Sequence, residues 1–253
     1  MNLNGQAAVV TGGGSGLGEA TAVALAAAGA KVAVFDLNED AARGVAERIG
    51  GIAVPCDVAD EHQATAALAA AAQAHGPARV LVNCAGVATP GRIVGKDGPL
   101  PLAAFERVIR VNLIGTFNMM RLAAAAMTPL DPMEDGERGV IVNTASVAAF
   151  DGQIGQPAYA ASKSGVVGLT LPAARELARF GIRVMTIAPG LFGTPMLFGL
   201  PKEAQASLGA SVPFPARLGE AHEYAALVLH IMANRMLNGE TIRLDGALRM
   251  APK

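Results

Sequence analysis

The chain of 253 residues is predicted to form a doubly wound α/β domain, in which helices cover both faces of a parallel β-sheet. Short apolar runs alternate with helical stretches along the whole chain. These runs are nearly continuous in apolar residues, as in strands buried on both faces. No linker rich in Pro, Gly and Ser divides the chain. We therefore expect one domain, residues 1–253.

The elements follow from the spacing of apolar residues and from the residues that end each run. Short β-branched runs indicate strands, and longer alanine-rich or periodic stretches indicate helices. Gly29 supplies a stop for the first helix. The expected strands are 7–10, 32–35, 52–55, 80–83, 140–144, 183–187 and 241–244, and the expected helices are 17–28, 39–49, 61–75, 102–127, 158–180 and 221–232.

Two irregular stretches and one proline modify this pattern. Residues 89–101 are rich in Gly and Pro and are expected to form a loop. Residues 191–215 contain four prolines and are expected to form a lid, because ligands of doubly wound folds bind beyond the carboxyl ends of the strands. Pro172 lies inside an expected helix and should kink or interrupt it.

The composition argues against several classes of protein. The 20 basic and 21 acidic residues include no basic block, so nucleic acid is not an expected partner. Much of the 52% hydrophobic content is alanine, and no run of strongly apolar residues is long enough to span a membrane. The first expected strand leaves no room for a signal peptide, and a cytoplasmic location is expected.

Neither the two cysteines nor the four histidines form a metal or disulfide pattern. Cys56 and Cys84 are too few for a disulfide scaffold and are expected to be buried, reduced thiols. His222 and Glu223 resemble the start of a zinc-binding helix, but Ala226 stands where the second His is required. We therefore expect no metal.

A glycine-rich turn, residues 11–18 with the sequence TGGGSGLG, joins the first expected strand to the first expected helix. Glycines permit a tight turn and let a pyrophosphate approach the backbone at a helix N-terminus, where N–H groups and the helix dipole favour anions. Alone, such a cluster is a weak signal, but its place between strand and helix is the context of a dinucleotide site. Gly12, Gly16 and Gly18 are expected to bind the cofactor.

Asp36 ends the second expected strand, 18 residues after Gly18. A carboxylate at this position can accept hydrogen bonds from the adenosine ribose hydroxyls and repels a 2′-phosphate. No Arg or Lys in the glycine turn could bind that phosphate, so the sequence favours NAD over NADP. The alternative for Asp36 is a cap on the next helix.

Tyr159 and Lys163 are four residues apart on an expected helix and therefore share one face. A free tyrosine has a pKa of about 10, which a neighbouring Lys⁺ and an oxidised nicotinamide ring would lower by stabilising the phenolate. Ser146 ends a strand and could hold the substrate oxygen beside the phenol. A Tyr–Lys pair alone is often a surface pair, but together with Ser146 and a nucleotide loop it indicates catalysis.

These residues, in order along the whole chain, resemble the short-chain dehydrogenase/reductase superfamily, although Cys84 stands where an Asn is commoner. The resemblance implies a Rossmann-like domain with a seven-stranded parallel sheet and proton transfer by Tyr159. It also implies that Asn112 holds a water connecting Lys163 to solvent. The matching residues are Thr11-Gly-x-x-x-Gly16-x-Gly18, Asn83-Cys84-Ala85-Gly86, Asn112, Ser146, Tyr159-x-x-x-Lys163 and Pro189-Gly190.

Residues 140–150, 187–195 and 237–246 look like the type II 3-hydroxyacyl-CoA dehydrogenases, the branch that includes 17β-hydroxysteroid dehydrogenase type 10. This narrower resemblance implies a homotetramer that oxidises short or 2-methyl-branched 3-hydroxyacyl-CoA in fatty acid metabolism and branched-chain amino acid degradation. The cofactor contacts that the resemblance implies, in addition to Gly86, Tyr159 and Lys163, are Ser15, Leu17, Asp36, Asp57, Val58, Cys84, Phe192 and Thr194.

Two groups of residues are candidates for substrate binding. Gln153 and Gln156 lie between Ser146 and Tyr159, where their amides could flank the reacting carbonyl or could simply be solvated loop residues. The lid contributes residues that suit a short apolar acyl chain, namely Leu191, Phe192, Met196, Leu197 and Phe198.

Three alternatives to this function stay open. One is a 3-oxoacyl-carrier-protein reductase, which Asp36 disfavours because that enzyme usually prefers NADPH. Another is a dehydrogenase of steroids or other secondary alcohols on the same scaffold. The third is a catalytically idle NAD-binding sensor or assembly subunit, against which the intact set of Ser146, Tyr159, Lys163 and Asn112 argues.

Overall fold

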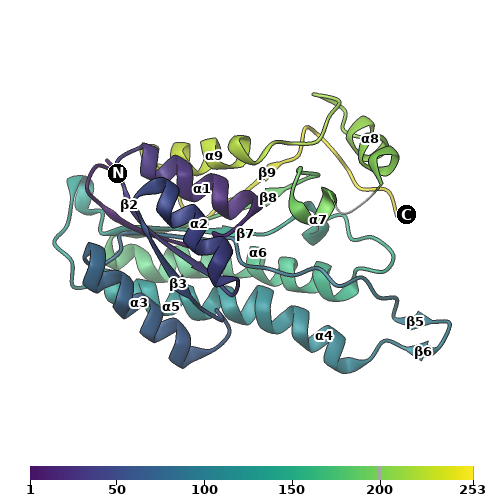
Figure 1. Ribbon diagram of the computed structural model, residues 1–253, viewed down its shortest axis with the longest axis horizontal. Helices are drawn as coiled ribbons and strands as arrows, with labels where there is room; N and C mark the ends of the chain where they lie inside the picture. The colour runs from purple at the N-terminus through teal and green to yellow at the C-terminus, as the bar shows by residue number, and fades with distance from the viewer. Residues whose placement is uncertain (199–200, 253) are drawn as a thin grey trace.

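A seven-stranded parallel sheet forms the centre of the computed structural model, which describes residues 1–198 and 201–252 (Figure 1). The strand order is β3-β2-β1-β4-β7-β8-β9. The predicted α/β class and the seven parallel strands are therefore confirmed. The strands are β1 (Ala7–Thr11), β2 (Lys31–Asp36), β3 (Ile52–Pro55), β4 (Val80–Asn83), β7 (Gly139–Thr144), β8 (Ile182–Pro189) and β9 (Thr241–Leu244).

The central strands are apolar at consecutive positions because both of their faces are covered. Every residue of β1, β4, β7 and β8 is buried. Strand β1 pairs in parallel with both β2 and β4, so the chain winds outward from β1 in both directions. The crevice at this change of direction, beyond the carboxyl ends of the strands, is where such sheets bind ligands.

Helices form a layer on each face of the sheet (Figure 1). Helices α1, α2 and α9 pack on one face through residues such as Leu25, Val45 and Val228. Helices α3, α5 and α6 pack on the other face through residues such as Met119 and Ala174. The bounds are α1 (Gly16–Ala27), α2 (Glu39–Ile49), α3 (Glu61–His75), α4 (Leu102–Ile109), α5 (Gly115–Met127), α6 (Pro157–Leu177), α7 (Pro195–Phe198), α8 (Lys202–Ala210) and α9 (Ala221–Ala233).

The expected helix 102–127 is divided by a π-helical turn, Arg110–Ile114, between α4 and α5. Within this turn the N–H of Gly115 bonds to the carbonyl of Arg110, five residues earlier. Such single π turns occur frequently at functional sites. Asn112 lies inside this one.

The structure differs from the sequence prediction at two further places. The expected loop 89–101 contains a short antiparallel hairpin, β5 (Val94–Gly95) and β6 (Gly98–Pro99). Helix α6 continues through Pro172 without interruption. Pro172 is exposed, so the carbonyl that loses its hydrogen bond there can be hydrated.

The expected lid, residues 191–215, contains the helices α7 and α8. The side chains of Met196 and Phe198 lie outside what the structure describes, so their expected contacts with a short acyl chain stay predictions. None of the described helices is long and apolar enough to cross a membrane.

Candidate active site

The backbone of the glycine turn is packed so closely that side chains at its glycines would clash, which leaves room for a ligand to contact the backbone directly. Gly12 has a φ of 62°, and a Cβ on this residue would lie 2.7 Å from the backbone of Ala85. A Cβ on Gly18 would lie 2.1 Å from the carbonyl oxygen of Gly12. Ser15 precedes α1 and does not cap it with its side chain, so the N–H groups of the first helical turn receive no hydrogen bond from that side chain. This cradle fits the pyrophosphate of a dinucleotide.

Asp36 lies against the glycine turn at the end of β2. One carboxylate oxygen accepts a hydrogen bond from the N–H of Gly14 at 3.0 Å, and the other accepts from the N–H of Asn38 at 2.9 Å. The alternative of Asp36 as a helix cap is wrong, because Asn38 caps α2 by accepting from the N–H of Ala41. Asp36 is thus held rigidly beside the cradle, as a ribose-binding carboxylate requires.

Asp57 and Val58 follow β3 at the same edge of the sheet. The carboxylate of Asp57 accepts from the N–H of Ala59 at 2.9 Å. The carbonyl of Val58 accepts from the amide of Asn118 at 2.9 Å. These bonds fix the turn after β3, and the predicted cofactor contacts of both residues stay predictions.

Ser146 and Tyr159 meet although 13 residues separate them in the sequence. Ser146 follows β7 in an extended backbone conformation, and its Oγ accepts from the N–H of Ala148 at 3.1 Å. Tyr159 lies in the first turn of α6, which begins with Pro157. Burial raises the pKa of Tyr159, and a hydrogen bond to Ser146 opposes that rise. The predicted lowering of this pKa does not occur in the protein alone, because removal of the phenol from water outweighs the hydrogen bond to Ser146.

Lys163 is one turn further along α6, and its Nζ lies 5.7 Å from the centre of the Tyr159 ring. The side chain is buried, with 4% exposed, and Nζ donates to the carbonyl of Thr144 at 2.8 Å. Burial lowers the pKa of Lys163 to about 8. Lys163 therefore keeps its charge at pH 7 but gives up a proton more easily than an exposed lysine does, and this property suits a residue that relays protons.

Asn112 is fully buried and joins three segments. Its Oδ1 accepts from the N–H of Val87 at 2.8 Å, and its Nδ2 donates to the carbonyl of Val87 at 2.9 Å. The same Nδ2 donates to Ser162 Oγ at 3.0 Å, and Ser162 donates to the carbonyl of Tyr159 at 2.8 Å. The π turn is therefore connected to the backbone of Tyr159. Ser162 lies within the Tyr–Lys motif but was not predicted as a site residue.

Gly86 brings the segment after β4 to the same place. A Cβ on Gly86 would lie 3.3 Å from Asn112 Oδ1 and 3.5 Å from Lys163 Nζ. Two residues earlier, Cys84 Sγ lies 3.6 Å from the hydroxyl of Thr144. Burial raises the pKa of the Cys84 thiol. Burial also raises the pKa of Cys56 to about 11. Both cysteines are free, as the sequence predicts, but only Cys56 is fully buried and Cys84 is partly exposed.

A second tyrosine lies behind this cluster and was not predicted from the sequence. Tyr224 on α9 is fully buried, and its hydroxyl lies 2.7 Å from the hydroxyl of Thr144. That threonine hydroxyl also donates to the carbonyl of Asn83 at 2.6 Å. No local sequence signal could place Tyr224 here, because 80 residues separate it from Thr144.

The remaining predicted residues lie around the cluster. Gln153 donates to the carbonyl of Ala251 at 2.9 Å, and Gln156 donates to Gln153 at 3.4 Å, so both side chains take part in loop contacts. Phe192 is buried in the core. Thr194 lies beside the start of α1, since a Cβ on Gly16 would be 3.6 Å from its Cγ2. The segment expected to form the lid thus begins next to the glycine turn.

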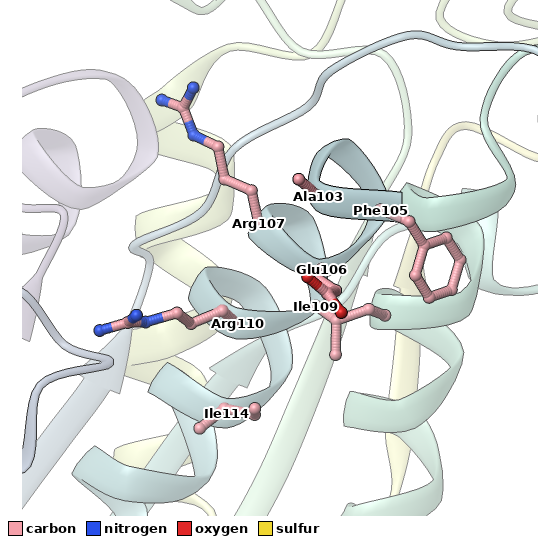
Figure 2. A pocket seen from close by; sticks show the side chains of 7 residues that line it. All are labelled: Ala103, Phe105, Glu106, Arg107, Ile109, Arg110 and Ile114. Carbon is pink, nitrogen blue, oxygen red and sulfur yellow. The ribbon is translucent and has the colours of Figure 1, made fainter. Parts of the chain in front are cut away.

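No group of three or more His, Cys, Asp or Glu side chains that could hold a metal ion occurs in residues 1–198 and 201–252. A groove elsewhere on the surface follows α4 and the π turn, with Phe105 pointing to one side and Arg107 and Arg110 to the other (Figure 2). It contains none of the predicted site residues. Its lining consists of Ala103, Phe105, Glu106, Arg107, Ile109, Arg110 and Ile114.

The family model of the short chain dehydrogenases matches residues 6–205 of this chain. The chain belongs to the short-chain dehydrogenase family. This short-chain dehydrogenase is 54% identical over 248 residues to the 3-hydroxyacyl-CoA dehydrogenase type-2 of Drosophila melanogaster, covering 96% of this chain and 97% of that protein. It is 52% identical over 255 residues to the Homo sapiens protein of the same name, covering 99% and 98%. The crystal structure of 3-hydroxyacyl-CoA dehydrogenase type-2 from Mycobacterium avium matches with a TM-score of 0.94 and 44% identity over 98% of both chains.

Membership of this family makes the chain an oxidoreductase that uses a nicotinamide cofactor. The cluster of Ser146, Tyr159, Lys163 and Asn112, at the carboxyl edge of the sheet beside the glycine turn, is its candidate active site. The catalytic roles of these four residues stay predictions.

Proposed function

We propose that this dehydrogenase interconverts 3-hydroxyacyl-CoA and 3-oxoacyl-CoA esters with NAD, and that its substrates have short or 2-methyl-branched acyl chains. The observation that carries the proposal is identity of 50–54% over nearly the full chain to five proteins named 3-hydroxyacyl-CoA dehydrogenase type-2. The geometry of Ser146, Tyr159 and Lys163 agrees with this chemistry.

Three residues of the cluster have distinct parts in the reaction. The hydroxyl of Ser146 holds the substrate oxygen, and the Tyr159 oxygen accepts the proton of the substrate alcohol during oxidation. The Lys163 ammonium stabilises the phenolate that must form first, against the effect of burial on the Tyr159 pKa. Bound NAD supplies the acceptor for the hydride that leaves carbon 3. The glycine turn and Asp36 would hold its pyrophosphate and its adenosine ribose.

Cofactor choice gives the first prediction. NAD⁺ should be used with a much higher kcat/KM than NADP⁺, because the Asp36 carboxylate lies within 3.0 Å of Gly14 N and would repel a 2′-phosphate. Steady-state rates with both cofactors measure the preference. Asp36→Ala should lower the ratio of kcat/KM with NAD⁺ to kcat/KM with NADP⁺. Asp40 is an exposed acid on the next helix, and Asp40→Ala should leave that ratio unchanged. Equal use of both cofactors by the unmodified enzyme would contradict the assignment.

Substrate choice gives the second prediction. Acetoacetyl-CoA reduction by NADH should proceed with a higher kcat/KM than the reduction of free ketones or steroids. The net charge of −1 provides no strong field for the anionic CoA, so the acyl end and local contacts must provide recognition. A panel of acyl-CoA esters, free ketones and steroids tests it. If steroids or free ketones exceeded every short acyl-CoA ester, the substrate proposal would fail and the dehydrogenase assignment would stand.

We also propose a homotetramer in the cytoplasm. The groove along α4 supports self-association, since its residue Ile114 is 50% exposed and the neighbouring Phe117 on α5 is 46% exposed. Apolar side chains that are exposed along a helix are suited to packing against a second copy of the chain.

A further inference from the structure

The segment that joins Ser146 to α6 determines how the two predicted catalytic oxygens face each other. Ser146 precedes this segment and Tyr159 follows it on α6. Its outer part, residues 150–156, is here named the connecting loop. None of its residues is buried, and Phe150 and Ile154 are 49% and 53% exposed. Apolar packing therefore does not fix the connecting loop, and its polar contacts must do so.

An arginine from the last strand makes the strongest of these contacts. Arg243 on β9 donates to both carboxylate oxygens of Asp151, at 2.6 and 3.2 Å. Its Nε donates to Asp245 at 2.7 Å. The side chains of Asp151 and Arg243 are 15% and 20% exposed, so the pair is largely shielded from water. A two-pronged contact of this kind needs the planar fork of arginine.

The C-terminal segment, residues 245–252, adds further contacts on the same side. The N–H of Met250 donates to Asp151 at 3.3 Å, and the N–H of Ile154 donates to the carbonyl of Pro252 at 3.0 Å. Gln153 donates to the carbonyl of Ala251 at 2.9 Å. Arg243 also orders this segment, because it donates to the carbonyl of Leu248 at 2.8 Å.

We propose that Arg243 is a positioning residue, which holds the connecting loop through Asp151 so that Ser146 and Tyr159 meet on the substrate oxygen. This inference rests on the proposed function and gives a part in it to Arg243, which lies 84 positions after Tyr159 in the sequence. Catalytic groups must be held within about 0.5 Å of their productive geometry. A loop without buried side chains satisfies that demand only if contacts from another element fix it.

The test compares turnover with cofactor binding in Arg243→Gln and Asp151→Asn. With NADH and acetoacetyl-CoA, each variant should lose about 10²-fold in kcat, the effect expected from a displacement of about 1 Å at the reacting groups. The dissociation constant for NADH should not change, because the glycine turn is not touched by this pair. The double variant should be no worse than Arg243→Gln, since both changes break one contact. Arg243→Lys, which keeps the charge without the fork, should give an intermediate kcat.

A matched control distinguishes positioning from stability. Arg235 is 30% exposed and binds Glu134 and Asp135 at 2.6 and 2.9 Å. It lies before the amino end of β9, whereas Arg243 lies near the carboxyl end of that strand. Arg235→Gln should lower the Tm and leave kcat per NADH-binding site unchanged. An Arg243→Gln variant with normal kcat per NADH-binding site would overturn the proposal, whatever its Tm. If Arg243→Gln does not fold, a normal kcat of Asp151→Asn would overturn it instead.

A failure of the proposed function gives a different result. In that case the unmodified enzyme itself would not reduce acetoacetyl-CoA. Hydrogen exchange of the backbone amides of residues 150–156 in the NADH complex then tests the positioning role directly. Faster exchange in Arg243→Gln than in Arg235→Gln would support it, and equal exchange would overturn it.

Discussion

Replacing Tyr159 with phenylalanine is expected to lower kcat by at least about 10²- to 10⁴-fold, the usual contribution of general acid–base catalysis. The substitution keeps the aromatic ring and its packing at the start of α6 but removes the oxygen that exchanges the proton. The dissociation constant for NADH should therefore be preserved. Stopped-flow reduction of acetoacetyl-CoA, with NADH binding measured by fluorescence, separates the two quantities.

The other tyrosine of the chain provides a matched control for this substitution. Tyr224→Phe removes the hydroxyl that lies 2.7 Å from Thr144, in the core behind the site. It should reduce the free energy of unfolding by about 1–2 kcal/mol through the lost buried hydrogen bond while kcat stays near that of the unmodified enzyme. A Tyr159→Phe variant with near-normal kcat would show that another group transfers the proton.

Replacing Lys163 with methionine is expected to change stability and turnover in opposite directions. The lowering of its pKa from 10.5 to about 8 by burial means that the folded protein disfavours the ammonium by about 3 kcal/mol. Methionine has a similar length and no charge, and loss of the bond to Thr144 offsets part of the gain. The free energy of unfolding at pH 7 should rise by about 1–3 kcal/mol. Turnover should fall by at least about 10²-fold, because the phenolate loses its neighbouring cation.

The pH dependence of that stability difference follows from the direction of the shift. Below pH 8 Lys163 is charged in both the folded and the unfolded protein, so the full cost of burying it is present. Between pH 8 and pH 10.5 only the unfolded protein keeps the charge, and the cost decreases. Urea unfolding at pH 7 and near pH 10 should show the stabilisation shrinking. A Lys163→Met variant that is less stable at both pH values would contradict the burial of a charged lysine.

The features that the sequence predicted correctly depend on local patterns. Continuous apolar runs identified all seven strands, and the glycine turn lies between β1 and α1, where it was expected. The spacing of Tyr159 and Lys163 placed both residues on one side of a helix. Each of these signals extends over fewer than about ten residues, within the range where periodicity and turn chemistry act.

The features that were missed depend on contacts between distant segments or on solvent. Arg243 and Asp151 are separated by 92 residues, and nothing near either one indicates the other. The π turn around Asn112 has no periodic signal, because it adds one residue to an otherwise regular helix. The interruption expected at Pro172 did not occur, since that proline faces solvent. These three features therefore depend on the tertiary environment of the residues and not on local sequence propensity.

The most direct test of the proposed reaction follows the hydride itself. NADH carrying deuterium at both C4 positions is incubated with the enzyme and acetoacetyl-CoA, and the product is analysed by mass spectrometry. We expect 3-hydroxybutyryl-CoA with one deuterium, bound to carbon 3, formed by the unmodified enzyme and at a strongly reduced rate by Tyr159→Phe. Absence of this product, or a product without deuterium at carbon 3, would contradict direct transfer between the nicotinamide and the acyl-CoA.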